Sequence, residues 1–271
     1  MLSNYPAAAS HISDWMREYA ETAGKKKLVI PVSGGLDSAV ASTLAAMTGL
    51  TVIAVTMPVS SKNSPLAEKH LTWLREHFPN VETYSSDIGD VYRMAVEEYA
   101  LPMSDLAKAN LQSRMRMVRA YQFAGEDALV VGTGNKVEDY GLGFFTKYGD
   151  GGVDFSPLGD LTKTEVRFLA IFLDIIPSII AATPTDGLWE DGRSDEEALG
   201  MTYVEAELCM QYHENLISPE MERQSIDDII HVIPEAHRNL YRKFRKWHDS
   251  TRHKMYTPPI CEIPEEFYEQ V

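Results

Sequence analysis

The residues with the clearest chemical potential form one short loop, Ser33-Gly34-Gly35-Leu36-Asp37-Ser38. An apolar run from Leu28 to Val32 leads into the loop, and a helix-like segment from Ala39 to Met47 follows it. This order predicts a buried strand, a tight turn and a helix N-terminus. Adjacent glycines permit the turn and a close ligand approach, and the N–H groups of a helix start favour an anion such as phosphate. The Asp37 carboxylate is compatible with a phosphate that carries a metal ion.

A second polar motif follows another predicted strand. The apolar run 128–132 ends in Thr133-Gly134-Asn135-Lys136-Val137-Glu138. In an open parallel sheet, ligands bind beyond the carboxyl ends of the strands. Both motifs occupy such ends, so we expect them to converge on one site.

A glycine-rich segment comes next, from Gly143 to Asp154. It has four glycines in ten residues, together with aromatic residues, a lysine and two aspartates. This composition is poor for a core and typical of a loop. The segment Pro157 to Lys163 then leads into a further helix.

The first loop lacks the Gly-x-x-x-x-Gly-Lys pattern of a Walker loop. It resembles the Ser-Gly-Gly-x-Asp-Ser signature of the PP-loop ATP pyrophosphatases, which split ATP into AMP and pyrophosphate. The later motifs, Thr-Gly-Asn-x-x-Glu, Gly-Phe-Phe-Thr-Lys-Tyr-Gly-Asp-Gly-Gly-x-Asp, Pro-Leu-x-x-Leu-x-Lys and Asp195-Glu196-x-x-Leu199-Gly200, look like those of NAD synthetase. They occur in the order of that family, from about Ser33 to about Tyr203.

This resemblance implies a ligase reaction. The nicotinate carboxylate of deamido-NAD would attack the α-phosphate of ATP, giving an adenylated carboxylate and pyrophosphate. Ammonia would then attack the activated carbonyl and release NAD and AMP. Such a site needs phosphate clamps, metal ligands and a substrate cradle, with little acid–base machinery.

The resemblance also assigns residues to ATP and to Mg²⁺. Asp37 and Glu138 would bind Mg²⁺, and Asp37 and Lys163 would be the catalytic residues. The alternatives are a helix cap for Asp37, a surface acid for Glu138 and an ordinary first-turn lysine for Lys163. The residues implied in ATP binding are Ser33, Gly34, Gly35, Asp37, Ser38, Thr133, Lys163 and Thr185.

Deamido-NAD would be bound by residues from three further segments. Arg114 belongs to a segment that resembles the Asn-x-x-x-Arg-x-Arg helix start of the family, and His253-Lys254 resembles a short motif near its C-terminus. Phe144 and Phe145 either stack on a ring or pack in the core. The full implied set is Arg114, Lys147, Asp150, Asp154, His253 and Lys254.

The order of apolar runs predicts an α/β fold, a doubly wound and mostly parallel sheet with helices on both faces. We expect residues 1–271 to form a single NAD synthetase-like domain, with a mobile lid loop at 183–200 and an extended tail at 251–271. The predicted strands are 28–32, 51–56, 81–84 and 128–132. The predicted helices are 7–23, 39–47, 66–77, 91–99, 110–124, 162–173, 202–215 and 235–250.

Composition restricts the functional class. The 271 residues have no apolar run long enough to span a membrane, and the N-terminus lacks the basic-then-apolar order of a signal peptide. Two cysteines exclude a disulfide framework, so we expect a cytoplasmic protein. A net charge of −15 disfavours nucleic acid as a partner.

The remaining partners follow from the family resemblance. The expected partners are deamido-NAD, ATP and ammonia, with a second copy of the chain in a homodimer. The chain leaves no room for a glutaminase domain beside the synthetase, so we expect ammonia itself or a separate donor to supply the nitrogen.

Two rival functions share the first motif. One is another PP-loop adenylating enzyme, for example one that modifies tRNA, which would favour paired cysteines and a basic face. The other is an adenine-nucleotide sensor without catalysis, which would tolerate loss of the carboxylates Asp37 and Glu138. The isolated Cys209 and Cys261 disfavour the first, and the presence of both carboxylates disfavours the second.

Overall fold

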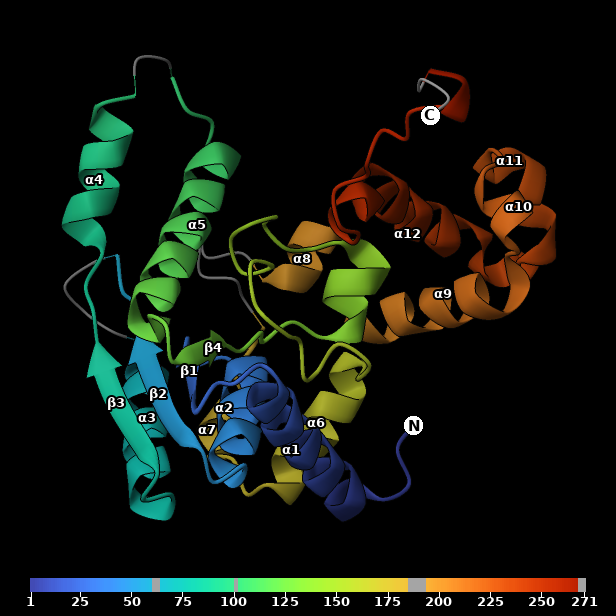
Figure 1. Ribbon diagram of the computed structural model, residues 1–271. Helices are drawn as coiled ribbons and strands as arrows, with labels where there is room; N and C mark the ends of the chain where they lie inside the picture. The colour runs from blue at the N-terminus through green and yellow to red at the C-terminus, as the bar shows by residue number, and fades with distance from the viewer. Residues whose placement is uncertain (60–63, 100–101, 185–193, 268–271) are drawn as a thin grey trace.

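A parallel sheet of four strands, with helices on both faces, forms one side of the molecule in the computed structural model (Figure 1). The strands lie in the order β3-β2-β1-β4 and all run in the same direction, which confirms the predicted fold class. Their bounds are β1 Lys27–Pro31, β2 Thr51–Thr56, β3 Val81–Ser85 and β4 Ala128–Val130. The structure describes residues 1–59, 64–99, 102–184 and 194–267.

The register of the sheet follows from its apolar, β-branched strands. Val29 of β1 lies opposite Ile53 of β2 on one side and Val130 of β4 on the other. Leu28, Val29 and Ile30 are fully buried, as expected for a central parallel strand covered on both faces. Successive side chains point to opposite faces, so Leu28 and Ile30 join one core and Val29 joins another.

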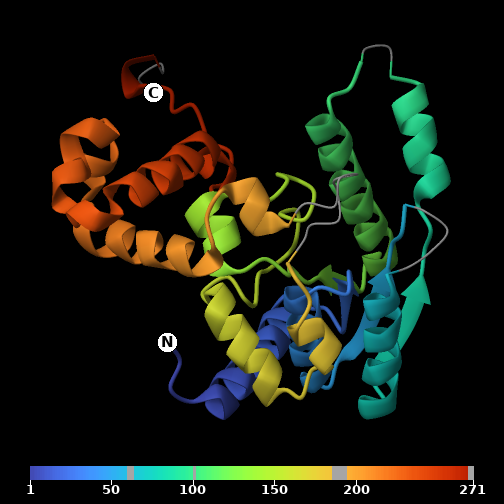
Figure 2. The ribbon, with the colours of Figure 1, turned by 180° about the vertical axis from the view of Figure 1, so that it is seen from behind.

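Helices cover both faces of the sheet (Figures 1 and 2). On one face, α2 is almost wholly buried because its small residues pack against the sheet and against α1 and α6. On the other face, α5 packs on β1 and β4 through Ala120 and Ala124. The first layer comprises α1 Tyr5–Thr22, α2 Leu36–Met47, α3 Pro65–His77, α6 Lys163–Phe172 and α7 Pro177–Ile180; the second has α4 Gly89–Glu97 and α5 Asp105–Ala124.

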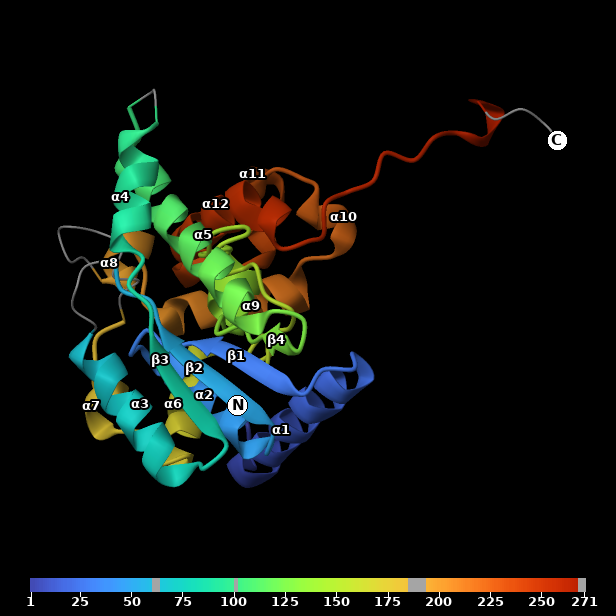
Figure 3. The same ribbon diagram turned by 60° about the vertical axis from the view of Figure 1, so that its left-hand side comes forward.

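A separate core lies beside the sheet, among the C-terminal helices. Tyr241 and Phe244 are fully buried there, and the π-helix η1 packs against α9 and α12. Beyond η4 the chain runs away from the body of the molecule (Figure 3). The elements of this part are η1 Lys136–Leu142, α8 Asp195–Leu199, α9 Tyr203–Leu216, α10 Pro219–Glu222, α11 Ile226–Ile229, η2 Ile230–Val232, η3 Glu235–His237, α12 Arg238–Thr251, η4 Arg252–Lys254 and η5 Glu265–Phe267.

The predicted strands and long helices are found, with ends that shift by a few residues. The largest difference at a helix start is α5, which begins at Asp105 because Ser104 accepts a hydrogen bond from Ala107 N and caps it. The π-helix η1 and the short helices were not predicted, because a single turn leaves no hydrophobic periodicity to detect. No described helix has the length and apolarity that crossing a bilayer requires.

The first loop contains a glycine that no other residue can replace without strain. Gly34 has a φ of +87°, and a Cβ atom added to it would lie 2.5 Å from the backbone nitrogen of Ala67 in α3. Gly49 has a similar φ of +77°, but an added Cβ would meet nothing within 4 Å. The two positions therefore separate backbone strain from steric conflict.

We expect Gly34→Ala to destabilise the fold more than Gly49→Ala. The shared left-handed conformation costs roughly 1–2 kcal/mol for alanine, and the clash at Gly34 adds about 1–3 kcal/mol. Urea unfolding followed by circular dichroism measures both variants. Equal unfolding free energies for the two variants would show that α3 yields to the new methyl group.

Candidate active site

The two predicted motifs meet at the carboxyl edge of the sheet. Strand β1 leads through the Ser33–Gly35 turn into α2, and β4 leads through residues 131–135 into η1. Chain connections leave β1 and β4 towards opposite sides of the sheet, so the position between these neighbouring strands is a topological switch point. Ligands of doubly wound sheets bind at such a point.

The turn after β1 is held by its own hydroxyl groups. The Ser33 and Ser38 oxygens lie 3.0 Å apart, and Ser38 Oγ donates to the Gly35 carbonyl at 3.0 Å. Gly35 N donates to Ser33 Oγ at 3.2 Å. Helix α2 begins at Leu36, and the first N–H groups of a helix have no carbonyl partner within it. The turn therefore presents a helix start to an anion.

A buried ion-pair cluster stands beside this turn. Lys163 Nζ, at the start of α6, lies 2.6 Å from Asp37 Oδ2 and 2.9 Å from Glu138 Oε1. Lys163 is only 5% exposed. A capping box fixes this helix start, with the Thr162 and Glu165 side chains bonding to each other's backbone nitrogens. Three residues from separate segments thus share one desolvated position.

The charges of the cluster shift its pKa values in different directions. Burial alone would lower the pKa of Lys163, but the carboxylates of Asp37 and Glu138 outweigh burial and raise it. Burial raises the pKa of Glu138, yet the Lys163 ammonium and the hydrogen bond from Tyr203 lower it overall. Burial and the nearby Glu138 charge raise the pKa of Asp37 against the opposing effect of Lys163. Lys163 is therefore a permanent cation in this site.

Asn135 ties the two motifs together. Its side-chain oxygen accepts hydrogen bonds from the backbone nitrogens of Val137 and Glu138, each at 3.1 Å, and so begins η1. Its side-chain nitrogen donates to Asp37 Oδ1 at 3.5 Å. Asn135 is fully buried, so these hydrogen bonds take the place of those that its side chain would make with water.

Two further residues support Glu138. The Tyr203 hydroxyl lies 2.5 Å from Glu138 Oε1 and 3.1 Å from Asp195 Oδ2, and the Tyr203 ring lies 4.8 Å from Lys163 Nζ. Burial and the negative charge of Glu138 raise the pKa of the Tyr203 hydroxyl, so it stays a proton donor. Tyr203 fixes the Glu138 carboxylate and gives Lys163 a cation–π contact.

A second, more open pocket of about 320 Å³ lies between α5, the glycine-rich loop and η4. It brings together four of the residues predicted to bind deamido-NAD: Arg114, Lys147, His253 and Lys254. Asn110, Phe145, Thr146 and Tyr148 also line it. Arg114 Nε donates to the Lys147 carbonyl at 3.3 Å, and Lys147 Nζ donates to the His253 carbonyl at 3.3 Å.

Asp150 and Asp154 are not among the residues that line this pocket. Asp150 Oδ1 accepts hydrogen bonds from Ser113 Oγ at 2.7 Å and from Thr146 N at 2.9 Å. Asp154 Oδ2 accepts from Val130 N at 2.6 Å, and its other oxygen accepts from the Tyr121 hydroxyl. In this structure both carboxylates hold the glycine-rich loop against the sheet and α5.

Thr133 lies in the loop between β4 and η1, half-buried, while Thr185 and most of the predicted lid lie outside the described residues. Phe144 packs in the C-terminal core, edge-on to Trp247 at 6.0 Å between ring centres. Phe145 lines the second pocket, where Lys254 Nζ lies 4.8 Å from its ring centre.

With this geometry in view, a comparison with known proteins gives the family. The family model for NAD synthase matches residues 8–258. The chain belongs to the NAD synthase family. Its relatives include the NH(3)-dependent NAD(+) synthetases of Archaeoglobus fulgidus, 34% identical over 96% of this chain and 98% of that protein, and of Methanosarcina mazei, 35% identical over 94% and 98%.

A solved structure of an NMN synthetase from Francisella tularensis is also similar to this NAD synthase family member. It superposes with a TM-score of 0.80 and 27% sequence identity, over 96% of this chain and 99% of that one. The similarity extends over both the sheet and the C-terminal helices. The predicted family resemblance is confirmed over a longer stretch than the motifs from Ser33 to Tyr203 had indicated.

Four residues of this NAD synthase site were not predicted as site residues: Asn135, Asp139, Asp195 and Tyr203. Asp139 is partly buried, and desolvation together with the charges of Asp150, Glu138 and Asp37 raises its pKa well above the ordinary value. A Cβ atom at Gly134 would overlap the Asp139 carboxylate, so Gly134 makes room for it. Asn135, Asp195 and Tyr203 lie within or next to the motifs that resemble those of NAD synthetase, and this position was the signal in the sequence that could have identified them.

We expect Lys163→Met to destabilise the protein by about 3–5 kcal/mol at pH 7, because it leaves two buried carboxylates without their cation. In this variant the folded-state pKa of Glu138 rises above its unfolded value, and that of Asp37, already raised in the parent protein, rises further. The loss should therefore shrink as the pH falls towards 4 and the carboxyl groups take up protons. Urea unfolding across this pH range measures the effect.

The exposed Lys246 of α12 provides the matched control. Lys246→Met should change the unfolding free energy by less than about 0.5 kcal/mol. A Lys163→Met variant as stable as this control at pH 7 would contradict the structural role of the ion-pair cluster.

Proposed function

We propose that this chain joins ammonia to the nicotinate carboxylate of deamido-NAD, with ATP as the activating co-substrate. One observation carries the proposal: in a member of the NAD synthase family, Asp37, Glu138 and Lys163 meet at the switch point of the sheet. The NH(3)-dependent names of the relatives support ammonia as the nitrogen source.

The reaction needs activation because a carboxylate has no good leaving group. Attack of the nicotinate oxygen on the α-phosphate of ATP forms a C–O–P linkage and releases pyrophosphate. Attack of ammonia on the carbonyl carbon then forms the amide bond and expels AMP. A preorganised cationic pocket lowers the barrier of the first step by stabilising charge on the phosphates.

The residues fit Mg²⁺ as the metal. Asp37 and Glu138 offer carboxylate oxygens, the ligand type that Mg²⁺ prefers, and both already contact one cation in Lys163. When bound, Mg²⁺ would neutralise charge on the departing pyrophosphate. Asn135 and Tyr203 orient the two carboxylates, as outer partners do in metal sites.

Lys163 and the first loop would act on the phosphates directly. The raised pKa of Lys163 keeps its ammonium charged, so it can donate to a phosphate oxygen while remaining between the carboxylates. The start of α2 and the Ser33 and Ser38 hydroxyl groups would bind the pyrophosphate. We retain Thr133 and Thr185 as ATP contacts.

Deamido-NAD would occupy the second pocket. Arg114, Lys147 and Lys254 bring three basic side chains to its lining, which suits the phosphates of a dinucleotide. Phe145 offers a ring for stacking. We retain Asp150 and Asp154 as deamido-NAD contacts only through a rearrangement of the glycine-rich loop, since their carboxylates bond within the protein.

The similarity to an NMN synthetase favours one alternative acceptor. Nicotinate mononucleotide has the same reacting carboxylate but lacks the AMP half of deamido-NAD. The first step of the chemistry and the role of the ion-pair cluster would be the same. The two acceptors differ in how much of the basic pocket they need to fill.

The deciding experiment supplies ATP, Mg²⁺ and ammonium with either deamido-NAD or nicotinate mononucleotide. We expect NAD to form only when all four components of the deamido-NAD mixture are present. Preferential amidation of the mononucleotide would make nicotinate mononucleotide the substrate in place of deamido-NAD. Pyrophosphate release in the absence of both acceptors would favour another adenylating enzyme. ATP binding without any product would favour a nucleotide sensor.

The variant that tests the role of Asp37 in this assay is Asp37→Asn, which preserves the shape of the side chain and removes its charge. It should abolish pyrophosphate release while circular dichroism stays unchanged. The matched control is Asp90→Asn in the exposed first turn of α4, which should keep full activity.

Lys147→Ala should raise the KM for deamido-NAD by about tenfold, because one charged hydrogen bond to a phosphate is lost. The KM for ATP should change by less than about twofold. Steady-state kinetics with each substrate varied in turn measures the difference. Lys26→Ala, at the exposed amino end of β1, is the control, and an unchanged deamido-NAD KM in Lys147→Ala would remove Lys147 from the substrate pocket.

The finer properties implied by the family complete the proposal. We propose a single synthetase domain over residues 1–271, a lid at 183–200, a homodimer and a cytoplasmic location. The extended tail predicted at 251–271 we place after η4, because Thr251 ends α12 and Arg252–Lys254 form a 3-10 turn. Exposed apolar residues on α4 and α5, among them Met94 and Val118, support a contact between copies. Sedimentation velocity tests the dimer, and a monomer at micromolar concentration would contradict it.

A further inference from the structure

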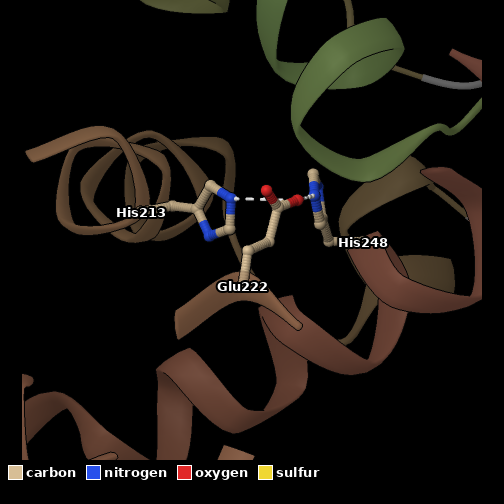
Figure 4. Close-up of side chains that lie close together, drawn as sticks. All are labelled: His213, Glu222 and His248. Carbon is tan, nitrogen blue, oxygen red and sulfur yellow. Dashed lines mark ion pairs between the residues drawn. The ribbon is translucent and has the colours of Figure 1, made fainter. Parts of the chain in front are cut away.

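A cluster of potential metal ligands lies in the C-terminal helices, outside the site described above. His213 of α9, Glu222 at the end of α10 and His248 of α12 point towards one another (Figure 4). One ligand atom from each lies within 4.8 Å of the others. Two imidazoles and a carboxylate form a donor set typical of Zn²⁺ sites.

The orientation of His248 leaves one nitrogen for a ligand. Its Nδ1 lies 2.8 Å from the Gly141 carbonyl, and since a carbonyl only accepts, Nδ1 carries the proton. Nε2 is then an acceptor, 3.5 Å from Glu222 Oε1. This Nε2 atom is buried and makes no hydrogen bond with any described residue. An unsatisfied buried acceptor of this kind needs an explanation, and a bound cation supplies one.

His213 also has a partner on one ring nitrogen, here a hydroxyl that can either donate or accept. Its Nδ1 lies 3.0 Å from the Tyr241 hydroxyl, and its Nε2 faces Glu222 Oε1 at 3.9 Å. Burial, with the neighbouring His248, lowers the pKa of His213 to about 4, so its ring is neutral at pH 7. Both histidines thus have an outer partner on one nitrogen and direct the other to the same point, the usual pattern around a metal.

We propose that His213, Glu222 and His248 bind a divalent transition metal ion of the Zn²⁺ class. Tetrahedral ligands at zinc distances lie about 3.3 Å apart, so the separations from Glu222 to the two histidines require only a small contraction. A cavity of about 270 Å³ is lined by all three residues and gives room for water as a fourth ligand. The proposal is independent of the proposed ligase function.

Nearby cations limit the affinity of this site. Arg252 Nη1 lies 3.3 Å from Glu222 Oε1, and Arg245 donates to the Glu222 carbonyl at 3.2 Å. Lys136, which also lines the cavity, is paired with Glu214 at 3.0 Å and Asp160 at 3.6 Å. Arg252 is half-exposed and competes directly with the metal for the Glu222 carboxylate. Removing Arg252 should therefore strengthen metal binding.

A metal here would join three helices and reach the active site through one contact. It would bridge α9, α10 and α12, and His248 already bonds to Gly141 in η1. The same π-helix carries Glu138. Metal binding to the folded state alone would raise the thermal midpoint with increasing metal concentration.

The test uses the full chain after removal of metals with EDTA. Calorimetric titration with Zn²⁺ in excess Mg²⁺ should give one strong site per chain, and Co²⁺ should give the visible absorption of a tetrahedral complex. Glu222→Gln and His248→Gln should each lower the affinity by at least about tenfold. Tyr241→Phe, which removes an outer partner, should also lower it by about tenfold.

Two matched variants separate this site from incidental binding. His231→Gln removes an exposed histidine of η2, and Cys261→Ser removes an exposed thiol; both should bind Zn²⁺ as the parent protein does. Arg252→Gln should bind it more tightly. Absence of a strong site in the parent protein, equal affinity in Glu222→Gln, or loss of the site in His231→Gln would overturn the proposal. Should His248→Gln fail to fold, Glu222→Gln and Arg252→Gln still decide.

Discussion

The structure of the candidate active site depends on a single constraint, the burial of the Lys163 ammonium between two carboxylates. A buried charge is tolerated only when it is paired and hydrogen-bonded. Lys163 starts α6, Asp37 lies in the first turn of α2, and Glu138 lies in η1, so the pairing fixes three segments that are far apart in the chain. The capping box at Thr162 fixes where α6 begins, and the buried cap at Asn135 fixes where η1 begins. These two caps therefore set the positions of Lys163 and Glu138.

The same constraint couples the sheet to the C-terminal helices. Glu138 belongs to η1, whose apolar residues Val137 and Leu142 are buried in the C-terminal core. Tyr203, at the start of α9, is also part of that core, yet its hydroxyl reaches Glu138. Packing of these helices therefore positions a carboxylate of the candidate active site. A change in the helices, including one at the His213 cluster, has a physical route to the ion pairs.

The strands and the convergence of the two motifs could be predicted because each depends on local pattern and on sheet geometry. Apolar runs end at polar loops, and the carboxyl ends of parallel strands share an edge, so Asp37 and Glu138 could converge, and the adjacency of β1 and β4 brings them together. To predict that Lys163 pairs with Asp37 and Glu138, one must know where α6 packs. Spacing alone does not provide that, and here the family resemblance supplied the residue.

The sequence pattern could not predict the directions in which the side chains point. Asp150 and Asp154 stand in the same loop as Lys147, but their carboxylates bond to Ser113, Thr146, Val130 and Tyr121. Thr146 N is a backbone group of the loop itself, whereas Ser113 and Tyr121 belong to α5 and Val130 to β4, so these partners are set by tertiary packing. Tyr203 escaped prediction for the converse reason, since an apolar helix start gives no sign that its hydroxyl meets a distant carboxylate.

Charge distribution adds a last argument about the substrate. The chain carries a net charge of −15, yet the second pocket is lined by Arg114, Lys147 and Lys254. A local positive field within a negative surface attracts a small anion that fits the pocket while repelling an extended polyanion. Salt screens such a field over about 8 Å at physiological strength, so the selectivity acts at the mouth of the pocket. A dinucleotide, with its two phosphates, is a small anion of this kind.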